Sequence, residues 1–275
     1  MLTAMPTGTK GVSIAVLTAA VLATAACGGS AKKTAAPPAT SGTGSATAAA
    51  SAPATSATSA ATSSGAPTGA PGGSLTTAQI SKLLLTDKDD AGYTFNVSQD
   101  GTAVTTSQDT VTTGGAPCQA FVDAEEALST KYGTTAEVDR QLTKPNVAIG
   151  IESSVIAFPS ADKAAAMISD LAAGLKSCKN LAITQSGTVS VVMTPSAIPE
   201  LTKDGQAGYI NYMSAGGKTE LMAADLVHVG TAVSVVAFIG PMSNDPALLQ
   251  QMGGKQLSHL SDVQVGRLKT AQGLS

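Results

Sequence analysis

The chain has 275 residues and contains no tryptophan, four phenylalanines and four tyrosines, so its core must be built from aliphatic side chains and methionine. Residues 28–74 are all Ala, Gly, Ser, Thr or Pro except Lys32 and Lys33, which leaves 75–275 as one domain-sized unit. All nineteen acidic residues lie at or after Asp87, so this unit is acidic, and nucleic acid is excluded as an expected partner.

The N-terminus is typical of a secretion signal. Lys10 precedes an apolar run over 11–26, which ends in small residues before Cys27. The run is too short to span a bilayer stably. The stretch VLATAACGGS around Cys27 resembles a bacterial lipobox, which implies that residues 1–26 are a lipoprotein signal peptide and that Cys27 becomes lipidated. An ordinary secretory signal with an incidental cysteine is the alternative.

The segment 27–74 is expected to be a disordered tether. Beyond Cys27 it has no apolar side chain larger than Ala and Pro, so it buries too little surface to offset the entropy of ordering its backbone. The sequence therefore predicts a domain that an N-terminal lipid holds at the outer face of the cytoplasmic membrane.

The first half of the domain predicts helices and one early strand. Leu75–Lys88 suits an amphipathic helix capped by Thr76 or Thr77, and Tyr93, Phe95 and Val97 alternate as in a strand. Residues 99–116 are rich in Thr, Ser, Gly and Asp and suggest a long loop. A helix is expected over 116–128, with Phe121, Val122 and Leu128 facing inward.

The second half predicts a sheet and two further helices. Apolar alternation over 147–158 indicates a central strand, and Ser160 caps an alanine-rich helix that runs to about Lys179. Asn244 or Asp245 begins the last helix, with Leu257 and Leu260 on its apolar face. Four more strands, the last three forming a meander, are expected at 188–193, 209–213, 219–229 and 231–239. The fold class is therefore α+β, with a single antiparallel sheet flanked by helices.

Two cysteines remain after Cys27 is assigned to the lipid. Cys118 and Cys178 lie in a part of the chain that leaves the cytosol, where an even count favours a disulfide. A reactive or metal-binding thiol is the alternative.

Catalytic and metal-binding motifs are weak. The SxxK pattern at Ser160–Lys163 and the GGKT at 216–219 lack their companion residues, and they fit a helix cap and a hairpin turn. His228 and His259 are too few for a zinc site. The methionines suit core packing better than a copper(I) site, and the acidic groups Asp87–Asp90 and Glu125–Glu126 are expected to be solvated. No catalysis, cofactor or metal is therefore predicted.

Several short motifs follow one another along residues 75–265. They are Gly92-Tyr93, Pro117-Cys118, Lys131-Tyr132-Gly133 and, most distinctive, a strand ending in Ala157-Phe158-Pro159-Ser160 before an alanine-rich helix that closes at Cys178. This order resembles the PknH-like extracellular domain, the sensor part of actinobacterial membrane serine/threonine kinases, which also occurs alone in lipoproteins. The resemblance implies an antiparallel sheet with flanking helices and a cleft for an unidentified extracellular ligand. Relatives often carry a second disulfide and a tryptophan that this chain lacks.

These observations predict a membrane-anchored, non-catalytic, sensor-like lipoprotein. Its cleft is expected between sheet and helices, lined by Tyr209, Tyr212 and Met213, and its ligand to be a lipid, a cell-wall fragment or another small molecule. The alternative is a structural or protein-interaction module of the cell envelope, with an envelope protein as its partner and no small-molecule pocket.

Overall fold

The structure, a computed structural model, covers the domain that follows the tether. It describes residues 73–102, 104, 109–185, 189–215, 218–241 and 254–274. Cys27, the signal peptide and nearly all of the expected tether lie outside the described residues. Within the described ranges, no helix combines the length and the apolar character needed to cross a membrane.

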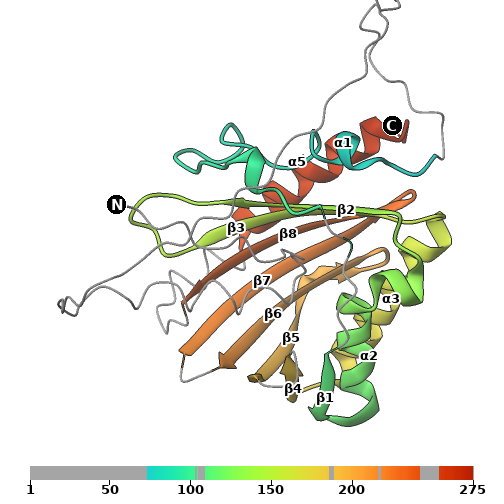
Figure 1. Ribbon diagram of the computed structural model, residues 1–275, viewed down its shortest axis with the longest axis vertical. Helices are drawn as coiled ribbons and strands as arrows, with labels where there is room; N and C mark the ends of the chain where they lie inside the picture. The colour runs from blue at the N-terminus through green and yellow to red at the C-terminus, as the bar shows by residue number, and fades with distance from the viewer. Residues whose placement is uncertain are drawn as a thin grey trace, which may run out of the picture.

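The domain is built on one eight-stranded sheet in which every neighbouring pair is antiparallel, in the order β1-β4-β5-β6-β7-β8-β3-β2 (Figure 1). The strands are β1 (Thr110–Thr113), β2 (Ala136–Leu142), β3 (Gly150–Ala157), β4 (Leu181–Gln185), β5 (Val189–Lys203), β6 (Gln206–Ala215), β7 (Lys218–Val229) and β8 (Ala232–Pro241). The helices are α1 (Thr77–Ile80), α2 (Gly115–Glu126), α3 (Ala161–Ser177) and α5 (Lys255–Ala271), with a 3₁₀ turn η3 (Val97–Gln99) and a π-helical turn η4 (Leu128–Tyr132). The predicted α+β class with a single antiparallel sheet is confirmed.

The predicted meander is present and longer than expected. Strands β5 to β8 pair in sequence order, and the turn between β7 and β8 uses Gly230 at a φ of 56°, which a side chain would strain. Strands β2 and β4 were not predicted from the sequence. Both are short, and β2 carries three charged residues that obscure its apolar alternation.

The helices divide between the two faces of the sheet, and side chains alternate between them. On β8, Val233, Val235 and Ala237 join the core cluster that contains residues of α2 and α3, whereas Val236 and Phe238 join the cluster that contains Leu257 and Leu260 of α5. We call these the α2/α3 face and the α1/α5 face. Figure 1 shows α2 and α3 side by side near β1, and α1 close to α5.

The alanine-rich helix α3 begins where the sequence predicts. The Ser160 side chain accepts a hydrogen bond from the backbone of Lys163, so Ser160 is the helix cap. Helices α2 and α3 pack closely because Gly174 has no side chain: a Cβ atom there would lie 2.8 Å from the Cα of Phe121. Phe121, Val122 and Leu128 are buried, as expected.

The segment from residue 75 to 99 differs from the prediction. The helix is only four residues long, capped by Thr76, because the chain then turns to bury Leu84 and Leu85. The backbone N–H of Leu85 donates to Ser153 Oγ on β3, so a tertiary hydrogen bond replaces a helical one. The predicted strand at 93–97 is wrong. Only Thr94 forms a bridge, and Asn96 caps the 3₁₀ turn instead.

Two other expectations are partly met. The stretch 99–116, expected to be a long loop, contains β1 and the start of α2. The predicted start of the last helix at Asn244 or Asp245 lies outside the described residues. The described helix α5 begins at Lys255, and its expected inward residues Leu257 and Leu260 are buried.

Candidate functional site

A polar cavity of about 480 Å³ lies between β1, α2 and the π-helical turn that follows α2. Its walls are rich in carboxylates, and the described lining residues include no aromatic ring. The lining residues are Asp109, Thr110, Gln119, Asp123, Glu126, Ala127, Thr130 and Lys131. A volume of this size is typical of small-molecule sites, and π-helical turns occur frequently at functional sites.

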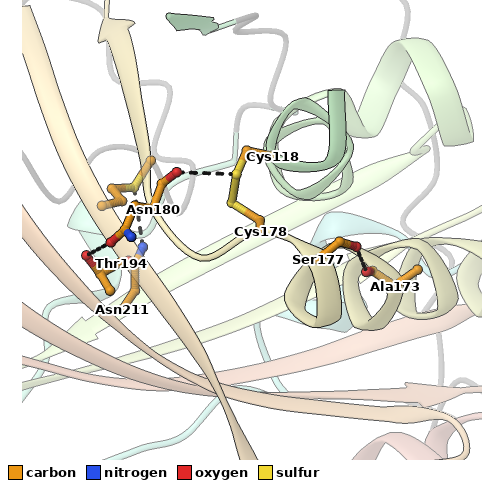
Figure 2. The surroundings of a disulfide bond; sticks show 8 residues. Cys118, Ala173, Ser177, Cys178, Asn180, Thr194 and Asn211 are labelled. Atoms are coloured by element: carbon orange, nitrogen blue, oxygen red, sulfur yellow. Dashed lines mark hydrogen bonds between the residues drawn. A yellow bond between two sulfur atoms is a disulfide. The ribbon is translucent and has the colours of Figure 1, made fainter. Parts of the chain in front are cut away.

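The disulfide expected from the sequence is present and fixes the wall of this cavity. Cys118 in the first turn of α2 is bonded to Cys178 at the C-terminus of α3, with 4.7 Å between their Cα atoms (Figure 2). Cys118 Sγ also lies 3.6 Å from the backbone oxygen of Asn180, and the Asn180 side chain accepts a hydrogen bond from Thr194 on β5. Helix α2, which supplies Gln119, Asp123 and Glu126 to the cavity, is therefore tied to both α3 and the sheet.

Hydrogen bonds hold the polar walls of the cavity in place. Gln119 accepts from the backbone of Val111 on β1, and its amide donates to Asp123 Oδ1 at 2.7 Å. The backbone of Asp109 donates to Glu126 Oε2 at 3.0 Å. Strand β1 and the residue before it are thus joined to helix α2, and two carboxylates of the cavity are held by hydrogen bonds.

The carboxyl of Asp109, a residue that lines the cavity, is enclosed by protein. Asp109 is 7% exposed, and its Oδ2 atom is buried without a hydrogen bond. Burial raises the pKa of Asp109. Burial also raises the pKa of Glu126 to about 7, and the neighbouring Asp109 and Asp123 carboxyls add to that rise. The Asp109 and Glu126 carboxyls also interact with each other, so the ionisation of one affects the other.

The expectation that Glu125 and Glu126 are solvated is wrong. Both are buried, because the last turn of α2 lies between the sheet and the cavity. Glu126 faces the cavity, whereas Glu125 accepts a hydrogen bond from the Tyr209 hydroxyl on β6. Burial raises the pKa of Glu125 to about 8 and also raises the pKa of Tyr209.

A second group of buried acids was not predicted. Glu137 and Asp139 on β2 and Glu152 on β3 share the α2/α3 face, and all three are buried. Burial, together with repulsion from Glu137, raises the pKa of Glu152 to about 7 and that of Asp139 well above its ordinary value. The signal in the sequence is the alternation of Ala136, Val138 and Leu142 with acids, which marks a strand with one acidic face.

The structure does not bring the three predicted ligand-binding residues together. Tyr209 and Met213 lie on the α2/α3 face, and both are buried. Tyr212 is half-buried and packs on the opposite face against the cluster of α5. All three cannot line one cleft. Side chains alternate between the two faces along β6, so residues 209 and 213 point to one face and residue 212 points to the other.

The weaker motifs are also separated. The Nε2 atom of His228 on β7 lies 2.8 Å from the backbone oxygen of Gly230. His259 on α5 is exposed. Met193, Met213 and Met222 pack in the core of the α2/α3 face. Among the described residues, no group of His, Cys, Asp and Glu has an arrangement suited to a metal ion.

Comparison with known proteins agrees with this architecture. The family model of the PknH-like extracellular domain matches residues 75–263. The chain belongs to the PknH-like extracellular domain family. No curated protein matches the chain.

A solved structure shows the same fold. The crystal structure of the extracellular domain of PknH from Mycobacterium tuberculosis covers 72% of this chain, and the match covers 99% of that domain, with a TM-score of 0.53 and 16% sequence identity. The family resemblance identified from the sequence is confirmed. Membership of this family makes residues 75–263 an extracellular, sensor-type domain.

Proposed function

We propose that this chain is a membrane-anchored lipoprotein whose PknH-like domain binds an extracellular ligand in the cavity between β1, α2 and η4. The observation that carries the proposal is the cavity of about 480 Å³, whose described lining includes the carboxyl residues Asp109, Asp123 and Glu126. The cavity is pre-formed by the disulfide and by the Gln119 and Glu126 hydrogen bonds, so ligand binding would cost little ordering.

The domain is proposed to act without catalysis. The serine of the SxxK pattern serves as the cap of α3, and Lys163 is exposed. The nucleophile–base contact that acyl transfer requires is therefore not supported at this position.

The ligand proposal is tested by native mass spectrometry of the full chain, purified gently from its own host. We expect a mass excess that disappears after denaturation and refolding and that is reduced in the Asp109→Asn variant. Asp204→Asn removes an exposed carboxylate in a hairpin turn and is the matched control. A chain that carries no excess mass, with the disulfide intact, would contradict ligand capture and favour the protein-interaction alternative.

The protein-interaction alternative has less support from the distribution of exposed apolar side chains. Among the described residues, the exposed large apolar side chains are Val97, Val147, Val192 and Leu274. They belong to a 3₁₀ turn, a loop, β5 and the C-terminal end, so no single element presents an apolar patch.

The anchor is proposed to be a lipid on Cys27. The apolar run before Cys27 and the small residues around it support this assignment. We expect Cys27→Ala to release the protein into the medium and Ser30→Ala to leave it in the membrane fraction, as followed by immunoblotting of both fractions. Retention of Cys27→Ala in the membrane fraction would refute lipid anchoring.

A further inference from the structure

We propose that Met193 on β5, Met213 on β6 and Met222 on β7 form a binding site for a soft monovalent metal ion, Cu(I). None of these residues lines the cavity between β1, α2 and η4, so the inference goes beyond the proposed function. Soft thioether sulfur is a ligand that selects Cu(I) over harder metal ions. The sequence favours core packing for these methionines, but the order of the strands brings their three thioethers together.

Strand register places the three methionines on neighbouring strands and on one face of the sheet. Met193 and Met213 lie directly opposite each other in the β5–β6 pair, and Met222 lies opposite Asn211 in the β6–β7 pair. All three methionines belong to the core cluster of the α2/α3 face. Opposite residues have Cβ atoms about 5 Å apart and diagonal neighbours about 7 Å apart, and the long, unbranched methionine side chain can span these distances.

A buried amide distinguishes this group from apolar packing. Asn211 is 1% exposed, and its Nδ2 atom donates to the sulfur of Met193 at 3.3 Å (Figure 2). Its Oδ1 atom is buried and has no hydrogen-bond partner. An incompletely bonded amide in a dry core costs stability, and a bound ion is one reason for keeping it there. The N–H···S contact holds the Met193 sulfur beside Asn211, the residue opposite Met222, as outer hydrogen bonds orient metal ligands.

The methionine group is reachable from solvent on one side. Met193 and Met213 are 7% and 8% exposed, whereas Met222 is 1% exposed. The first two side chains therefore give an ion access to the third sulfur. In an extracellular domain thiols are drawn into disulfides, as Cys118 and Cys178 are, which leaves thioethers as the available soft ligands.

The test follows the methionine methyl groups by NMR while the full chain, solubilised in detergent, is titrated with Cu(I). The ion is added as its acetonitrile complex in oxygen-free buffer. We expect the methyl signals of Met193, Met213 and Met222 to shift together and to saturate at one ion per chain. Zn(II), which prefers nitrogen, oxygen and thiolate ligands, should leave them unchanged. The proposal is overturned if Cu(I) shifts none of these three signals, shifts only those of other methionines, or acts no differently from Zn(II).

Matched leucine substitutions locate the site. Met193→Leu and Met222→Leu each remove one thioether with little change in volume, and each should weaken Cu(I) binding by about tenfold or more. Met167→Leu makes the same change in a buried methionine of α3 and should bind like the wild type. Wild-type affinity in both strand variants, or an equal loss in Met167→Leu, would overturn the assignment. If a strand variant fails to fold, as judged by its thermal melting curve, the methyl spectra of the wild type decide by the outcomes given above.

The variant Asn211→Leu tests the positioning role of the amide. It removes the donor to Met193 and keeps all three thioethers, so Cu(I) should bind about tenfold more weakly while the same three methyl signals still shift. Wild-type affinity together with a changed melting temperature would show that Asn211 has only a structural role, and would overturn its part in the site.

Discussion

The two faces of the sheet differ in whether their buried polar side chains have hydrogen-bond partners. On the α1/α5 face, buried polar side chains are joined to partners in closed networks. Every unpartnered buried side-chain atom found among the described residues lies on the other side, toward α2 and α3. These atoms are Asp109 Oδ2, Asp139 Oδ2, Glu152 Oε1, Ser154 Oγ and Asn211 Oδ1.

Two side chains organise the α1/α5 face. Arg140 is 3% exposed, bonds Asp100 at 2.6 Å and donates to the backbone oxygens of Leu85 and Ser81. Gln264 of α5 accepts from Ser153 and donates to the sheet at three acceptors. These bonds attach the segment around α1, and α5 itself, to β2, β3 and β8.

The contrast indicates different roles for the two faces. The α1/α5 face attaches elements to the sheet, whereas the α2/α3 face contains carboxyl groups that can take up protons. In the network of Arg140 every buried side-chain polar atom has a partner, so the network holds elements together. On the other side, Asp109, Asp139 and Glu152 each have a buried oxygen without a partner and a raised pKa, so a proton stabilises them. We therefore expect mutations on the α1/α5 face to lower the free energy of unfolding most. We expect pH to change stability mainly through the α2/α3 face.

The largest expected effect comes from removing the Arg140–Asp100 ion pair on the α1/α5 face. Arg140→Met should lower the free energy of unfolding by about 4 to 5 kcal/mol, because it leaves the Asp100 carboxylate buried without its partner. Urea denaturation followed by circular dichroism measures the loss. The double variant Arg140→Met with Asp100→Leu should recover part of it. No recovery would show that packing of the Arg140 side chain, and not its charge, dominates.

Removing the disulfide should have the next largest effect. Changing both Cys118 and Cys178 to Ser is expected to lower the free energy of unfolding by about 3 to 4 kcal/mol, because the bond closes a long loop with a sequence separation of 60 residues. Denaturation of the wild type with and without a reductant provides the comparison. A reductant that destabilises the double variant as much as the wild type would contradict this account.

The buried carboxyl of Glu152 on the α2/α3 face should make the protein less stable as pH rises. The folded protein holds the Glu152 proton up to a pKa of about 7, whereas the unfolded chain releases it near 4.5, so stability present at pH 5 is lost as pH rises through 7. The contribution of Glu152 is about 3 kcal/mol between pH 5 and pH 8. Glu152→Gln should therefore raise the melting temperature at pH 8 and leave it nearly unchanged at pH 5.

The control for this pH effect is Glu200→Gln, which removes an exposed carboxylate of β5. It should not change how the melting temperature depends on pH. Parallel pH profiles for Glu152→Gln and the wild type would refute the assignment of this effect to Glu152.

The smallest effect is expected at the edge of the cavity. Lys131 and Asp170 form an ion pair whose side chains are 38% and 42% exposed, so solvent screens their attraction. Lys131→Ala should change the free energy of unfolding by less than about 1 kcal/mol in urea denaturation. A loss comparable to that of Arg140→Met would show that the pair is a structural attachment, which would weaken the contrast between the two faces.

The sequence by itself determined the elements whose signals are local. Ser160 and the apolar spacing of the next seventeen residues specify α3, and alternation over β6, β7 and β8 specifies the meander, because side-chain periodicity directly reports which face is buried. The motif order also indicated the family, and the count of cysteines favoured the disulfide. The helix and the hairpins of the meander depend mostly on contacts between residues near in sequence.

Only the tertiary structure decided where the acids lie. Glu125 and Glu126 look like a solvated pair in the sequence, yet both are buried: Glu125 accepts from Tyr209 on β6, and Glu126 accepts from the backbone of Asp109, just before β1. The residues 81–85 follow a helical pattern but leave the helix, because Arg140 and Ser153 offer their backbone better partners. A residue is buried by the elements that pack against it. Those elements are set by the order of the strands in the sheet, which a local sequence pattern does not encode.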